Sequence, residues 1–143
     1  MKSLYLDNAA TTKIDDNVLE AMLPYLKEKY GNPSSAHLFG EEARSAVENS
    51  REIIAKSIGA KRKEIIFTSG GTEANNMALK GIFFANRDKR KNHIIVSKIE
   101  HESILETCKW LEQHGAKITL LNVDKEGFVD LNELRKSLTN KTI

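Results

Sequence analysis

The chain has little cysteine and little proline, and no long apolar run. Its one cysteine, Cys108, cannot form an internal disulfide, so we expect a protein of the reducing cytoplasm. No apolar run reaches the roughly 18 residues of a membrane span, and the N-terminus lacks the apolar stretch of a cleaved signal peptide. Two prolines and eight scattered glycines give no repeat or low-complexity tract. Disulfide-stapled and membrane-spanning proteins are therefore excluded.

Charge of one sign is also missing. The 22 Lys and Arg residues nearly balance the 20 Asp and Glu residues, for a formal net charge of +2. Nucleic-acid binding usually requires clustered basic residues, so this balance argues against such a partner. The one basic cluster, Arg87 to Lys91, is interrupted by Asp88 and is most simply a solvated loop, with nucleic-acid or partner binding as the alternative. A composition of 40% hydrophobic and 29% charged residues predicts a folded, soluble domain.

Helical and strand-like patterns alternate along the chain. Capping residues, apolar spacing and glycines mark where each element begins and ends. The expected elements are, in chain order, an extended piece at 4–6, a helix capped by Asp15 or Asp16 and kinked at Pro24, a loop at 31–35, a long helix with apolar residues over 43–58 closed by Gly59, a strand at 64–68, a helix carrying residues 74–82, a strand at 94–96, a helix over 103–114 ended by Gly115, a strand at 118–123 and a short helix capped by Asp130.

This alternation predicts an α/β fold with a mainly parallel sheet and helices on both faces, joined by right-handed crossovers. We expect residues 1–14 to lead into a domain that occupies residues 15–143. The chain stops at residues 141–143, where another strand should begin, and a sheet that ends there has an open edge. We therefore expect an incomplete part of a larger domain.

The turn Ser69-Gly70-Gly71-Thr72 is the strongest local signal for binding. Glycines let backbone N–H groups approach an anion, the following helix start adds its positive dipole end, and the hydroxyl of Ser69 or Thr72 supplies a further donor. The turn matches neither GxxxxGK[ST] nor GxGxxG, which favours a single phosphate group over a nucleotide. The alternative is an ordinary tight turn with Thr72 as the helix cap.

His101 is the second candidate, because it follows the strand at 94–96. Loops at the carboxyl ends of parallel strands converge on one sheet edge, so His101 and the glycine turn can face one crevice. The alternative is an exposed residue at a helix start. Glu100, His101 and His37 lack metal-ligand spacing, so no metal site is predicted. Cys108 lies on the apolar stripe of its helix, which favours core packing over nucleophilic chemistry.

Four motifs, in order and spacing, resemble the start of the NifS/IscS-type cysteine desulfurases. They are YLDNAATT at 5–12, YGNPSSAH at 30–37, FTSGGTEANN at 67–76 and Glu100-His101. The similarity runs the whole length of this chain but covers well under half of a family member. It implies the fold-type I, class V aminotransferase group, and so the large domain of a PLP-dependent transferase.

Family members are homodimers that use pyridoxal 5′-phosphate to convert L-cysteine to L-alanine, leaving a persulfide on an enzyme cysteine. The sulfur then passes to an acceptor scaffold protein for iron–sulfur cluster or thiocofactor assembly. The resemblance implies that Gly71 and Thr72 hold the cofactor phosphate. It implies that His101 stacks on the pyridine ring, which makes it a cofactor-binding residue, and that it assists proton transfer as the catalytic residue of this chain.

Other functional residues of the family match no position here. Three of these residues are the lysine that carries the Schiff base, the aspartate that pairs with the pyridine nitrogen and the cysteine that carries the persulfide. All three fall in family segments beyond Ile143. We therefore expect an inactive piece, either truncated or one half of a split enzyme completed by a second chain. The alternative is a non-catalytic α/β module that binds a phosphorylated ligand or a partner chain; a stand-alone nucleotide-binding domain is disfavoured because its fingerprints are missing.

Overall fold

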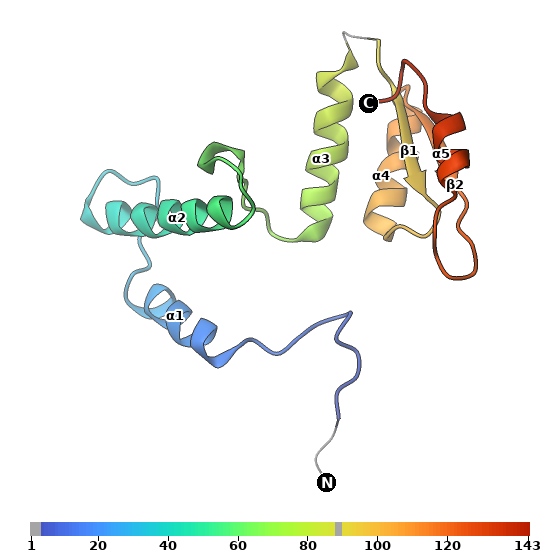
Figure 1. Ribbon diagram of the computed structural model, residues 1–143. Helices are drawn as coiled ribbons and strands as arrows, with labels where there is room; N and C mark the ends of the chain where they lie inside the picture. The colour runs from blue at the N-terminus through green and yellow to red at the C-terminus, as the bar shows by residue number, and fades with distance from the viewer. Residues whose placement is uncertain (1–3, 88–89) are drawn as a thin grey trace. The chain divides into compact units, whose positions relative to one another are not determined.

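The computed structural model describes residues 4–87 and 90–143 (Figure 1). Asp88 and Lys89 of the predicted basic loop lie outside the described residues. The chain divides into two compact units, Met1–Ile66 and Phe67–Ile143. The predicted division into a lead-in at 1–14 and a domain at 15–143 stays a prediction. Among the described residues, none of the helices has the length and apolar character needed to cross a membrane.

The first unit contains the first two of the predicted helices. Helix α1 spans Asp16–Lys27 with Asp15 as its cap, whose carboxylate accepts a hydrogen bond from the Asn17 backbone N–H. Helix α2 spans Leu38–Ser57 and ends at Gly59, whose φ of +68° lies in the left-handed region that favours glycine. Both helices and their end signals are as predicted. The extended piece at 4–6 is irregular and exposed.

The strand predicted at residues 64–68 does not form. Its first residue instead ends the 3₁₀ helix η1, Arg62–Glu64, where the Glu64 carboxylate accepts a hydrogen bond from the Lys61 N–H. The Ile65 carbonyl accepts a hydrogen bond from Arg51 Nε at 3.3 Å. A strand requires a neighbour along its hydrogen-bonding edge, and residues 65–68 pair with no strand in the described part of the chain. The apolar run alone was therefore insufficient for a strand.

The second unit is built on a parallel pair of strands, as the alternating pattern predicted. Strand β1, His93–Ser97, pairs in parallel with β2, Lys117–Leu121, and helix α4, Glu102–Gln113, crosses over between them. The crossover helix ends before Gly115, which has a φ of +95°. Helix α5, Leu131–Ser137, begins at the predicted cap Asp130, whose carboxylate accepts from the Asn132 N–H at 2.7 Å.

The last residues return to the other edge of β1. A parallel bridge joins His93 to Thr142, and the Ile143 N–H donates to the His93 carbonyl at 3.0 Å. Pairing therefore begins where a further strand was expected. Figure 1 shows α4 and α5 on opposite sides of the strands. Right-handed connections leaving a strand in opposite directions produce this arrangement.

The core of this unit lies between the sheet and its helices. Leu111 and Cys108 of α4, Phe83 of helix α3, Gly71–Ala85, and Leu121 of β2 are all buried. Burial raises the pKa of the Cys108 thiol, with smaller contributions from Glu112 and Glu100. The prediction that Cys108 packs in the core is confirmed.

Candidate functional site

The start of α3 presents free backbone donors. Gly70 precedes the helix, and its carbonyl accepts the first helical bond, from the Ala74 N–H at 3.1 Å. The N–H groups of Gly71 and Thr72 donate to no other residue within 4–87 or 90–143. The alternative that Thr72 caps the helix is wrong, because Gly70 occupies the cap position. Two unpaired donors at a positive dipole end suit an anion.

Neither glycine of the turn is required by local packing. A Cβ atom at Gly70 or Gly71 would meet nothing within 4 Å. The φ of Gly70, 164°, is extended backbone that any residue adopts. Glycine is also used where a ligand comes close to the backbone. The open space beside both glycines therefore fits a bound phosphate group.

Ser69 is already engaged by a neighbouring carboxylate. Its N–H and its hydroxyl donate to Glu73 Oε2 at 2.6 and 2.7 Å. The backbone bond first, and the hydroxyl bond second, lower the pKa of Glu73 and keep the side chain ionised. Of the two hydroxyls predicted as ligand donors, the Ser69 hydroxyl is thus occupied, which leaves that of Thr72.

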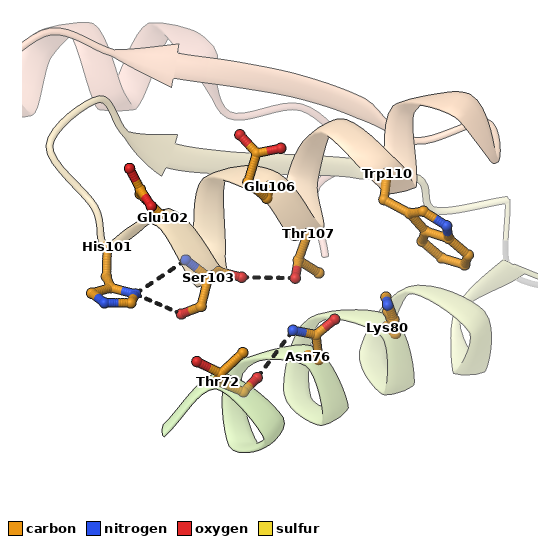
Figure 2. A pocket seen from close by; sticks show the side chains of 9 residues that line it. All are labelled: Thr72, Asn76, Lys80, His101, Glu102, Ser103, Glu106, Thr107 and Trp110. Atoms are coloured by element: carbon orange, nitrogen blue, oxygen red, sulfur yellow. Dashed lines mark hydrogen bonds between the residues drawn. The ribbon is translucent and has the colours of Figure 1, made fainter. Parts of the chain in front are cut away.

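A groove of about 380 Å³ lies between α3 and α4 (Figure 2). Its lining comes from both helices: Thr72, Asn76, Lys80, His101, Glu102, Ser103, Glu106, Thr107 and Trp110. The structure therefore brings together Thr72 and His101, which the sequence placed after different strands. Gly71, one residue before Thr72, is exposed and is not one of the lining residues.

His101 caps α4 and also lines the groove. Its Nδ1 accepts a hydrogen bond from the Ser103 N–H at 3.1 Å and lies 2.9 Å from the Ser103 hydroxyl. The imidazole is exposed at the helix start, as the structural alternative predicted. These two descriptions are compatible, because the cap uses one ring nitrogen and leaves Nε2 without a protein partner within the described residues.

The far wall of the groove is aromatic. Lys80 Nζ lies 4.3 Å from the centre of the Trp110 ring, and His114 stacks on that ring with centroids 3.7 Å apart. Trp110, Lys80 and Asn76 were not among the site residues predicted from the sequence. The spacing of Thr72, Asn76 and Lys80 could have indicated a shared surface, since residues four positions apart lie on one face of a helix such as α3.

A profile of the family described as aminotransferase class-V matches residues 4–143. The chain belongs to this family. No group of three or more His, Cys, Asp or Glu side chains that could hold a metal ion occurs in the described part of the chain.

Particular relatives narrow the class. The chain is 60% identical over 142 residues to a protein named cysteine desulfurase IscS from Dictyoglomus turgidum, covering 99% of this chain and 36% of that protein. A protein of the same name from Methanosarcina thermophila is 51% identical, with coverage of 99% and 35%. This chain therefore spans about a third of the length of the curated relatives it matches. The resemblance to NifS/IscS-type cysteine desulfurases is confirmed.

Solved structures agree with the fold. A structure titled NifS-like protein has a TM-score of 0.89 and 46% identity, covering 94% of this chain and 37% of that one. One titled SspA in complex with cysteine has a TM-score of 0.89 and 38% identity, covering 98% and 40%. The predicted α/β class with a parallel sheet is confirmed.

Proposed function

We propose that this chain provides the phosphate-binding helix start and the ring-facing histidine of a pyridoxal 5′-phosphate-dependent cysteine desulfurase. The whole enzyme would convert L-cysteine to L-alanine and pass the sulfur, as a persulfide, to an acceptor scaffold for iron–sulfur cluster or thiocofactor assembly. It would act as a cytoplasmic homodimer. The names of the relatives and the family match over residues 4–143 support an enzyme over a non-catalytic module.

One observation carries the proposal: Thr72 and His101, on two helices, line one groove beside the open N–H groups of α3. The donors at Gly71 and Thr72 suit the phosphate of the cofactor, and the Thr72 hydroxyl adds a third. Pyridoxal phosphate, when bound, supplies an electron sink for carbanion chemistry. The residues of this chain bind and orient it.

His101 would handle protons at its Nε2 atom. Nδ1 is occupied by Ser103, so Nε2 is the nitrogen left to meet a reacting group. An imidazole exchanges protons readily near neutral pH, and its flat face can pack against an aromatic ring. His101 is therefore proposed as both a cofactor-binding and a catalytic residue.

Thr72→Ala tests the phosphate site in the full-length protein. We expect cofactor affinity to fall by about 1–2 kcal/mol, because one charge-assisted hydrogen bond is lost. Titration with pyridoxal phosphate, followed by the absorbance of the bound form, measures the affinity. Thr72→Ser keeps the hydroxyl and should bind nearly as the parent does. Equal affinities for the parent and Thr72→Ala would remove Thr72 from the site.

His101→Ala tests the catalytic role. Turnover should fall more than cofactor retention does, because stacking is one of several contacts with the cofactor whereas proton transfer is specific to the imidazole. Alanine and sulfide formed from L-cysteine under reducing conditions report turnover. Bound cofactor is quantified on the same samples. Turnover at the parent rate would refute the catalytic assignment.

A further inference from the structure

A series of hydrogen bonds through three side chains, Asn75, Ser103 and His101, links the first turns of α3 to the start of α4. Asn75 Nδ2 donates to the Ser103 hydroxyl at 2.8 Å, between residues 28 positions apart. The Ser103 hydroxyl in turn lies 2.9 Å from His101 Nδ1. Asn75 is one helical turn beyond Gly71, so the link begins one turn from the proposed phosphate site. Asn75 and Ser103 are half-buried, whereas His101 is exposed.

The donor and acceptor roles in this series of hydrogen bonds follow from the Ser103 backbone N–H. The Ser103 backbone N–H can only donate, so His101 Nδ1 must present its lone pair. The Ser103 hydroxyl must then donate its proton to Nδ1 as well. Its oxygen is free to accept from the Asn75 amide, which is what the structure shows. A neutral His101 ring held in this way carries its proton on Nε2.

We propose that Asn75 and Ser103 are positioning residues that fix His101 in its Nε2–H tautomer and aim Nε2 at the groove. Asn75 acts through Ser103: its amide N–H donates to one lone pair of the hydroxyl oxygen, which favours the orientation with the hydroxyl proton toward the ring. Ser103 donates to the His101 ring through both its backbone N–H and its hydroxyl. The inference rests on the proposed function of His101, because a fixed tautomer matters where Nε2 handles a proton.

The first test reads the tautomer directly, without cofactor or turnover. The full-length protein is labelled with ¹⁵N-histidine, and long-range ¹H–¹⁵N correlation spectra are recorded. The His101 signals are assigned by their loss in His101→Gln. In the parent, Nδ1 should resonate as an unprotonated nitrogen and Nε2 as a protonated one.

Variants then separate positioning from mere packing. Ser103→Ala should move the His101 signals toward a mixture of tautomers, and Ser103→Thr, which keeps the hydroxyl, should restore the parent pattern. Asn75→Ala should shift them in the same direction by less. Matched controls are Asn86→Ala and Ser57→Ala, because within the described residues these side chains bond only to the carbonyls of Ile82 and Ile54. Both should leave the His101 signals unchanged.

Turnover gives the second readout. Ser103→Ala should lower kcat about threefold to tenfold, the worth of one hydrogen bond, with cofactor affinity unchanged. The charged groups of the groove, Lys80, Glu102 and Glu106, remain in every variant. Since Asn75 acts through Ser103, the double variant Asn75→Ala/Ser103→Ala should be no slower than Ser103→Ala alone.

Two results would overturn the positioning inference: parent-like His101 signals in Ser103→Ala, or a multiplicative loss of turnover in the double variant. Full turnover in His101→Gln would instead refute the proposed role of His101. The tautomer spectra would then decide the positioning by themselves, so the two failures are distinguishable.

Discussion

Replacing His93 with alanine should loosen the sheet of the second unit at its first paired residues. The His93 side chain is 2% exposed, and both ring nitrogens are bonded. Nδ1 lies 2.8 Å from the Thr142 hydroxyl, and Nε2 lies 2.8 Å from the Thr119 hydroxyl on β2. The ring therefore joins β1 to a neighbour on each edge.

The expected magnitude follows from these contacts. Two hydrogen bonds of about 0.5–1.5 kcal/mol each are lost, and the space of the ring is left partly unfilled. We expect the free energy of local opening to fall by about 2–4 kcal/mol, which corresponds to amide exchange faster by about 30- to 700-fold.

Hydrogen exchange followed by mass spectrometry on the full-length protein measures this effect. The informative peptides cover residues 93–97 and 117–121. His114→Ala is the matched control, because the His114 side chain is exposed and, among the described residues, contacts Trp110 alone, through a hydrogen bond to its carbonyl and by stacking on its ring. Exchange in His93→Ala within about threefold of the parent would refute the reasoning, since that is under 1 kcal/mol.

His93 should also make the hydrogen-exchange protection of the sheet depend on pH. Burial, and then the charge of Lys117, lower the pKa of His93 in the folded protein. Below about pH 6.5 the unfolded chain binds a proton that the folded chain does not, so stability falls as the pH drops through this range toward the folded pKa. Exchange protection, corrected for intrinsic rates, should thus decrease from about pH 7.5 to 5.5, and His93→Ala should lack this component.

Three further predictions follow from single residues. Leu111→Ala should cost about 2–5 kcal/mol of unfolding free energy, because Leu111 is fully buried; a loss under about 1 kcal/mol in denaturant titration would contradict the packing described. Asp130→Ala should cost about 0.5–2 kcal/mol and Asp130→Asn much less, by the same titration; equal costs would show that the cap bond contributes nothing. Cys108 should react slowly with iodoacetamide in the native protein, because burial raises its pKa; modification as fast as in denaturant would contradict that burial.

Local signals in the sequence predicted most of the helices. Asp15 and Asp130 cap helices where expected, and Gly59 and Gly115 end them in left-handed conformations. These signals depend on a few neighbouring residues, so a sequence contains all that they need. The strand expected at 64–68 depends on a partner strand, and an apolar run cannot specify one.

The candidate site, like the fold, was predicted only in part from the sequence. His101 and Thr72 line one groove, as predicted, but through helices α3 and α4 rather than through two converging strand ends, because the strand expected before the glycine turn does not form. The bond between Asn75 and Ser103 could not be foreseen, because it depends on how two helices face each other across 28 positions of sequence. The engagement of Ser69 by Glu73 spans four positions and was within reach of the pattern at the helix start.

The aromatic wall of the groove also provides a built-in optical probe. Trp110 is the one tryptophan among these 143 residues, and its ring contacts Lys80 and His114 rather than being sealed in the core. Its emission should respond to anything that enters the groove and displaces the Lys80 ammonium. Occupancy of the groove can therefore be followed in real time without attaching a label.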